Sequence, residues 1–133
     1  MPGIFTVFLV DDDIDDQEIF LFVMKEAYSG AHCVLAKDGV QALDKLRDSS
    51  FTPDIIFVDI NMPRMNGTEL LIELKKISRL SNTPVFMYST SDEQEIVATC
   101  KNLGASGFVK KYTDTDEVKK EFVQIISNLT TSE

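Results

Sequence analysis

Carboxylate, hydroxyl and ammonium side chains stand in this chain where short apolar runs end. Asp11 and Asp12 follow the first run, and Asp59 follows the third. Ser89 comes directly after the fourth run, and Lys111 lies just beyond the fifth. Carboxylates bind hard cations and can act as nucleophiles, while a hydroxyl and an ammonium can stabilise nearby negative charge. The chemistry open to this set depends on whether the fold brings its members together.

The apolar runs alternate five times with longer amphipathic segments, which is the pattern of a βα repeat. The runs predict strands at Ile4–Val10, Cys33–Ala36, Ile55–Val58, Val85–Tyr88 and Gly107–Val109. The segments between and after them predict helices at Asp15–Tyr28, Val40–Asp48, Thr68–Leu80, Glu93–Leu103 and Asp116–Leu129. No linker or low-complexity segment interrupts the series, so we expect one domain over residues 1–133, without an output domain.

Strands that are continuous apolar runs joined by helices belong in a parallel sheet that is covered on both faces. The predicted architecture is therefore an α/β three-layer sandwich around a five-stranded parallel sheet. Ligands of such sheets bind beyond the carboxyl ends of the strands, so one rim should hold all the residues named above. Carboxylates of the first and third strands can meet only if these strands are neighbours, which places a crevice between them.

Carboxylates that lie within a few ångströms of one another repel, so either one is protonated or a cation joins them. The expected ligands, Asp11, Asp12 and Asp59, have no His or Cys near them in the sequence. Oxygen ligands favour a hard ion, and an open site that keeps its waters favours Mg²⁺. We therefore expect Mg²⁺ as the cofactor.

Charge and motif content argue against several other functions. The formal net charge of −9 opposes binding to DNA or RNA. The nucleotide-binding patterns GxxxxGK[ST] and GxGxxG are absent. The run Ile4–Val10 is too short to span a bilayer and has no cationic stretch ahead of it, so we expect a cytoplasmic protein without a membrane partner. Cys33 and Cys100 lack metal-site spacing, and we expect free thiols.

Four segments carry a resemblance to a known family. They read VFLVDDD from residue 7, PDIIFVDINMPRMNG from residue 53, PVFMYSTS from residue 84 and GASGFVKKY from residue 104. Together they resemble the receiver domain of two-component response regulators over nearly the whole chain. The second segment is the most specific, because an Asp ends an apolar strand and is followed by Met-Pro and then by Gly67. The resemblance implies a flavodoxin-like (βα)5 fold with strand order 2-1-3-4-5.

The resemblance also implies a role for each acidic residue and for one lysine. Asp59 is the expected phosphoryl acceptor, and Asp11 and Asp12 form the acidic pair of the metal site. Asp12 and Asp59 would bind Mg²⁺ directly, with Asp11 acting through water. Asn61 would offer its backbone carbonyl to the metal, and Lys111 would pair with a phosphoryl oxygen.

Hydroxyl, aromatic and backbone groups complete the set that the resemblance implies. Ser89 matches the hydroxyl of the family's switch, and Phe108 matches its rotating aromatic side chain. The Ser89 hydroxyl and the backbone N–H groups of Met62 and Thr90 would donate to phosphoryl oxygens.

Two points about the lysine stay open. The family's lysine is usually followed by proline through a cis peptide, whereas Tyr112 follows Lys111 here. A cis bond before a non-proline residue costs about 3–4 kcal/mol, so a trans loop would aim the lysine differently. Lys110 is a second candidate, because a one-residue slip of the strand exchanges the two side chains across the sheet. Three further acids are expected to favour the positive end of the first helix: Asp13, Asp15 and Asp16.

By resemblance the function is signalling, not turnover of a separate substrate. The expected donor is a phosphohistidine of a sensor histidine kinase or a histidine phosphotransfer protein. The expected output is a protein contact through the fourth helix, fifth strand and fifth helix, from a monomer or weak dimer. Two alternatives remain: a Mg²⁺-dependent phosphatase, which would want an acid where Asn61 stands, and a pseudo-receiver that binds partners without phosphorylation.

Overall fold

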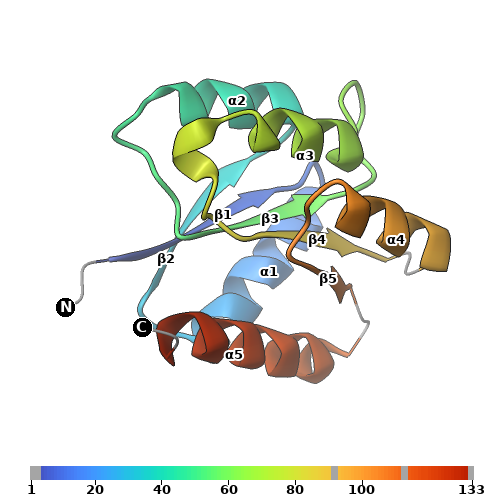
Figure 1. Cartoon of the computed structure of the whole chain (residues 1–133). Coiled ribbons are helices and arrows are strands. Elements are labelled where there is room, and N and C mark those ends of the chain that lie inside the picture. The colour runs from blue at the N-terminus through green and yellow to red at the C-terminus, as the bar shows by residue number, and fades with distance from the viewer. Residues whose placement is uncertain (1–3, 91–92, 112–113, 132–133) are drawn as a thin grey trace.

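A computed structural model of the chain describes residues 4–90, 93–111 and 114–131. Over these residues, five strands pair in parallel in the order β2-β1-β3-β4-β5, which confirms the predicted topology (Figure 1). The strands are β1 (Phe5–Val10), β2 (Ala31–Ala36), β3 (Ile55–Asp59), β4 (Val85–Ser89) and β5 (Gly107–Lys110). The helices are α1 (Ile14–Ala27), α2 (Gly39–Arg47), α3 (Gly67–Lys75), α4 (Gln94–Asn102) and α5 (Thr115–Thr131).

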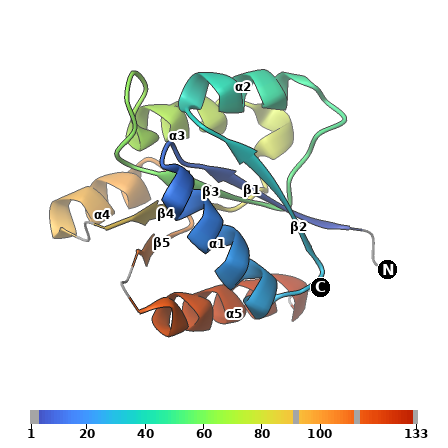
Figure 2. The same ribbon diagram turned by 180° about the vertical axis from the view of Figure 1, so that it is seen from behind.

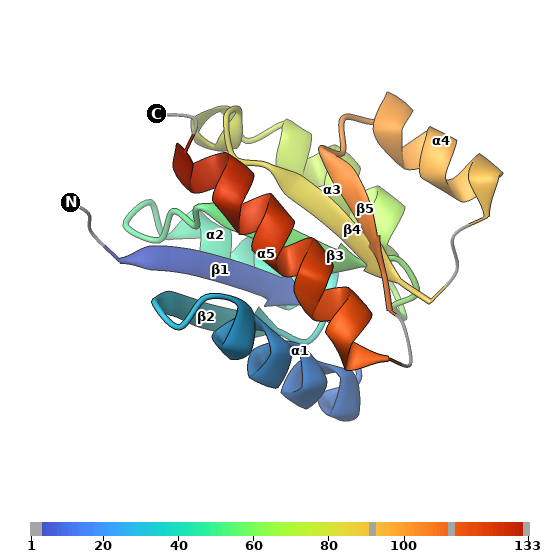
Figure 3. The same ribbon diagram turned by 90° about the horizontal axis from the view of Figure 1, so that it is seen from below.

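Helices cover both faces of the sheet, as the apolar character of the strands predicts. Helices α1 and α5 lie on one face, while α2 and α3 lie on the other, together with α4 near the β4 and β5 edge (Figures 1 and 2). Helix α5 crosses the sheet obliquely when the molecule is seen from below (Figure 3). The architecture is therefore the expected three-layer sandwich.

Strand β3 shows why two cores form. All of its side chains are buried, and alternate residues point to opposite faces. Ile56 and Val58 belong to the core under α2, α3 and α4, while Phe57 belongs to the core under α1 and α5. In the second core the ring centroids of Phe20 and Phe122 lie 5.2 Å and 5.3 Å from that of Phe57. This central strand is thereby held firmly on both sides, and it carries Asp59 at its end.

The third predicted helix, Thr68–Leu80, was too long. Helix α3 ends at Lys75, and residues Ser78–Leu80 form a separate 3₁₀ turn. Ile77 between them has an extended backbone with φ −87° and ψ 105°. Ile77 packs against the core and Leu80 is buried in it, so both keep the apolar spacing of a helix after the helix has ended. Hydrophobic periodicity alone could not reveal that break.

The structure also describes both cysteines. Cys33 and Cys100 are free thiols, and burial raises the pKa of each. Among the described residues, no helix is both long and apolar enough to cross a membrane.

Candidate functional site

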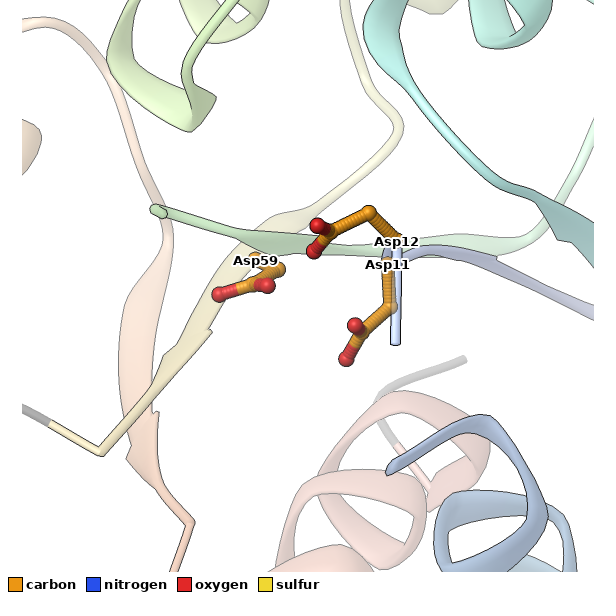
Figure 4. A group of neighbouring side chains, drawn as sticks. All are labelled: Asp11, Asp12 and Asp59. Carbon is orange, nitrogen blue, oxygen red and sulfur yellow. The ribbon is translucent and has the colours of Figure 1, made fainter. Parts of the chain in front are cut away.

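Three carboxylates gather at the carboxyl edge of the sheet. Strands β1 and β3 are neighbours with Val10 opposite Val58, so Asp11 and Asp59 follow at adjacent strand ends. Asp11, Asp12 and Asp59 each offer one carboxylate oxygen, and these oxygens all lie within 4.8 Å of one another (Figure 4). Asp11 and Asp59 are buried, whereas Asp12 is exposed. The carboxyl edge of the two neighbouring strands therefore carries a compact acidic cluster, in which Asp12 is exposed to solvent.

The cluster fits a divalent hard cation. All of its side-chain donors are carboxylate oxygens, which Mg²⁺ and similar ions prefer, and exposed Asp12 leaves room for water ligands. Asp11 is engaged elsewhere, because its Oδ1 accepts from the Asp13 N–H at 3.0 Å and its Oδ2 from the Lys111 ammonium at 2.8 Å. Asp59 Oδ1 accepts a longer bond of 3.2 Å from the Asn61 N–H, and Asp59 Oδ2 lies 3.6 Å from the Lys111 ammonium, so this carboxylate is held less tightly than that of Asp11.

Lys111 reaches into the cluster from the end of β5. Its Nζ lies 2.8 Å from Asp11 Oδ2, 2.8 Å from Asp16 Oδ2 and 3.6 Å from Asp59 Oδ2. The same Nζ lies 5.0 Å from the centre of the Tyr88 ring. Lys110 is the last residue of β5 and pairs with Ser89, so strand alternation directs its side chain to the opposite face. Of the two candidate lysines, Lys111 is the one that contacts the acids.

Burial dominates the electrostatics of the site. It raises the pKa of Asp59 to about 7, against the opposing charge of Lys111 and with the support of the negative charge of Asp11. Burial also raises the pKa of Asp11, although the hydrogen bond from Lys111 opposes that shift. For Lys111, burial by itself lowers the pKa, but the hydrogen bonds to Asp11 and Asp16 outweigh it and raise the pKa. Near neutral pH the site therefore holds a firmly protonated lysine beside a carboxyl group that is close to its midpoint.

The loop after β3 returns directly onto Asp59. The Gly67 N–H donates to the Ile60 carbonyl at 2.8 Å, and a Cβ atom at position 67 would lie 2.7 Å from Ile60 Cα. Asn66 caps α3 by accepting from the Glu69 N–H at 2.9 Å, while the Glu69 carboxylate accepts from the Asn66 N–H. The capping box and the close backbone approach together explain why this loop ends in Asn-Gly.

The remaining expected site residues take up positions around the cluster. Ser89 is buried at the end of β4, and its carbonyl accepts from the Lys111 N–H at 2.8 Å. Thr90 is exposed one residue further on, and Met62 is buried in the loop after β3. Phe108 is half-buried on β5 and packs against the core under α2, α3 and α4. Tyr112, which stands where the family usually has proline, lies outside the described residues.

Sequence reasoning missed three neighbours of the site. Asp16 was expected only to favour the start of α1, yet its carboxylate holds the Lys111 ammonium. Tyr88 supplies the ring below that ammonium. Gln17 donates from Nε2 to the Asp11 carbonyl at 2.6 Å and so supports the acidic loop. No local pattern could have revealed the contact of Asp16, because its partner lies 95 residues away in the chain.

The curated proteins that this chain resembles include two named regulators. It is 37% identical over 100 residues to the Regulator of RpoS of Escherichia coli K12, which covers 74% of this chain and 28% of that protein. It is 31% identical over 124 residues to the two-component response regulator ORR1 of rice, which covers 89% of this chain and 54% of that protein. The chain thus spans between about a quarter and about half of the length of these relatives.

The solved structures with a similar fold include two response regulators and a chemotaxis protein. The phosphorylated cyanobacterial phytochrome response regulator RcpA matches with a TM-score of 0.86 at 23% identity, over 98% of this chain and 97% of that one. The Vibrio cholerae chemotaxis protein CheY4 matches with a TM-score of 0.81 at 27% identity, over 92% of this chain and 99% of that one. The Mn²⁺-bound response regulator Rcp1 also matches, with a TM-score of 0.81 at 24% identity over 96% of both chains. Residues 7–123 match the response regulator receiver domain family, and the chain belongs to that family.

Proposed function

We propose that this chain accepts a phosphoryl group on Asp59 from a phosphohistidine of a sensor histidine kinase or a histidine phosphotransfer protein. The phosphorylated protein then presents an altered surface to a downstream protein, and residues 1–133 act as one receiver domain. The observation that carries the proposal is the position of the Asp59 carboxylate, which lies within 4.8 Å of the other acids of the cluster and 3.6 Å from the Lys111 ammonium. A nucleophile, an acidic pair for a cation and a fixed positive charge are thus present together.

The transfer itself needs an ionised Asp59. One of its carboxylate oxygens attacks phosphorus, and the new O–P bond forms while the P–N bond to the donor imidazole breaks. The bonding pair stays on the imidazole nitrogen, which takes a proton from water. Because burial raises the pKa of Asp59 to about 7, the nearby positive charge of Lys111 is needed to keep enough carboxylate ionised. The acyl phosphate is later hydrolysed. Water attacks phosphorus and the bond between phosphorus and the Asp59 oxygen breaks, which restores the carboxylate and releases inorganic phosphate.

Several groups stand ready to stabilise the phosphoryl oxygens. Lys111 places a largely buried ammonium beside Asp59 and would pair with one of these oxygens. The Ser89 hydroxyl and the backbone N–H groups of Met62 and Thr90 would donate to the others, which follows from their places at the ends of β3 and β4. Such fixed donors lower the barrier, because they need no rearrangement when charge develops.

The acidic cluster would hold Mg²⁺ through Asp12 and Asp59, with Asp11 acting through water and Asn61 through its backbone carbonyl. When bound, the ion would supply charge neutralisation for the phosphoryl group and fix its orientation. The chemistry of the donor set supports this choice, because its carboxylates include no softer ligand.

A surface beside β5 is suited to the output. Phosphorylation would shift a two-state equilibrium around Ser89 and Phe108, and a protein partner would read the shift on α4, β5 and α5. A groove of about 360 Å³ lies between α5 and the strands β4 and β5. Phe86, Phe108 and Ile125 give it apolar contacts, and α5 adds the charged side chains of Glu117, Lys120 and Glu121. The net charge of −9 supports a protein partner over nucleic acid, and we propose a cytoplasmic monomer or weak dimer.

Intact mass spectrometry with acetyl phosphate tests the proposal. The wild-type chain should gain one phosphoryl adduct with Mg²⁺, lose it over time and gain none in EDTA. An Asp59→Asn variant should gain none, while an Asp15→Asn variant, which removes an exposed acid, should behave as wild type. An adduct that persists in the Asp59→Asn variant contradicts the assignment of the acceptor. Mg²⁺ binding without any adduct would favour the pseudo-receiver function.

A further inference from the structure

Asp16 shares the Lys111 ammonium with the acidic cluster. It lies in the first turn of α1, and its Oδ2 is as close to Lys111 Nζ as Asp11 Oδ2, at 2.8 Å in both cases. The expected acceptor, Asp59, is farther from the same ammonium, at 3.6 Å. The lysine is therefore hydrogen-bonded to two acids that take no covalent part in the reaction, and its contact with Asp59 is the weakest of the three.

We propose that Asp16 is a positioning residue that holds Lys111 back from the acceptor and thereby slows the phosphorylation of Asp59. This inference rests on the proposed function, because it assigns Asp16 a part in that same reaction. The inference goes beyond the proposed function by naming a residue of α1 that sets the rate of phosphorylation.

The competition follows from the charges and the exposure of the partners. An ammonium has three N–H donors, and Asp11 and Asp16 already occupy two of them at short range. The third donor is left for Asp59, whose Oδ2 lies 3.6 Å away, so Lys111 must move partly away from one of these two acids to approach the acceptor closely. Asp16 is the acid that can release it, because its side chain is 35% exposed and water can replace the lysine, whereas the Asp11 side chain is fully buried.

Asp16 also places a negative charge next to the ammonium that would pair with an anionic phosphoryl group. Removing this charge while keeping the shape of the side chain, as in Asp16→Asn, should free the ammonium for the phosphoryl group. The contact is partly solvated, so the gain is modest: we expect phosphorylation about two- to fivefold faster, within the range for partly exposed ion pairs. Asp16→Glu keeps the charge and should stay close to the wild-type rate.

A purely structural role for Asp16 makes a different forecast. An acid in the first turn favours the positive end of a helix, and Asp15 in the same turn has the same effect. Asp15 is exposed, and no ion pair of Asp15 occurs within the described part of the chain. Asp15→Asn thus removes the same charge from the same turn without touching Lys111, and it is the matched control.

Two measurements on the full chain test the inference. The first is the rate constant of adduct formation with acetyl phosphate and Mg²⁺, followed by intact mass for the wild type, Asp16→Asn, Asp16→Glu and Asp15→Asn. The second is the ¹⁵Nζ signal of Lys111, assigned with a Lys111→Arg variant and recorded without any phosphoryl donor. We expect only Asp16→Asn both to accelerate the reaction and to move the lysine signal.

The outcomes are distinguishable. An unchanged lysine signal in Asp16→Asn would contradict the contact between Asp16 and Lys111. An equal acceleration in Asp15→Asn would show that the effect comes from the loss of any negative charge in this turn. A moved signal with an unchanged or slower reaction would overturn the competition. If no variant gains an adduct while the lysine signal still responds to Asp16→Asn, the proposed function has failed, and the rate-setting role of Asp16 fails with it.

Discussion

Gly67 lies so close to Asp59 that a Cβ atom at position 67 would sit 2.4 Å from the Asp59 carbonyl oxygen. The obstacle is backbone on both sides, so neither can move aside without shifting the end of β3. The turn after the expected acceptor is thus built against its backbone, and position 67 has no room for any side chain.

Gly67→Ala should therefore destabilise the fold by about 1–3 kcal/mol, the usual cost of overpacking. Denaturant unfolding followed by circular dichroism measures it, since the chain has no tryptophan. Gly39→Ala is the control, because the three atoms nearest its added Cβ all belong to the Met65 side chain, with Sδ at 2.7 Å. Equal losses in the two variants would contradict the backbone argument.

Asp59→Asn should make the metal-free protein more stable at alkaline pH. Burial raises the folded-state pKa of Asp59 to about 7 from an ordinary 3.8, so folding favours the protonated form. The stability linked to this proton is complete below about pH 4 and is lost as the pH rises through 7. In EDTA at pH 8 the free energy of unfolding of the variant should exceed that of the wild type by on the order of 2–4 kcal/mol.

The comparison of Asp59→Asn with the wild type at pH 4 is the control for this prediction. At pH 4 the two proteins should unfold at nearly the same denaturant concentration, because Asp59 is then neutral in the folded state and only about half ionised in the unfolded state. Added Mg²⁺ should narrow the difference at pH 8 by binding the folded wild type. A stability difference that is the same at pH 4 and pH 8 would show that the Asp59 charge is not responsible.

Lys111→Met should remove the counter-charge of the buried acids. Asp11 and Asp59 would then be left without their ammonium partner, and the loss at pH 8 should be about 3–5 kcal/mol, as for broken buried pairs. Lys111 lowers the pKa of Asp59, so the variant should also raise that pKa further and slow adduct formation at neutral pH. Lys76→Met is the control with the same change in an exposed pair with Glu73, and it should affect neither quantity nearly as much.

Arg79 ties the loop after α2 to the 3₁₀ turn. Its guanidinium donates to the carbonyls of Leu46 and Phe51, the latter at 3.0 Å, and to Thr52 Oγ1 at 3.0 Å. A lysine cannot match this fork, so Arg79→Lys should cost about 1–2 kcal/mol in thermal or denaturant unfolding. Arg47→Lys, in an exposed pair with Asp44, should cost less than about 0.5 kcal/mol. An unchanged stability of the Arg79→Lys variant would show that the hydrogen bonds of the guanidinium contribute little.

Element type and order could be predicted from the sequence because the hydrophobic pattern is local. The continuous apolar run Ile55–Val58 indicated a strand buried on both faces, and the structure confirms that it is central. Apart from the end of α3, the predicted elements begin and end within two residues of the observed ones. The end of α3 could not be predicted, because Ile77 stays packed against the core beyond it.

By itself, then, the sequence determined the five βα units and the rim on which Asp11, Asp59 and Ser89 stand, since the carboxyl ends of parallel strands share one edge. Only the tertiary structure decided which charges meet there. Strand alternation selects Lys111 over Lys110, and the packing of α1 beside that edge brings Asp16 to the ammonium from 95 residues away. Such contacts depend on how separate elements are placed in space, and no local pattern records that placement.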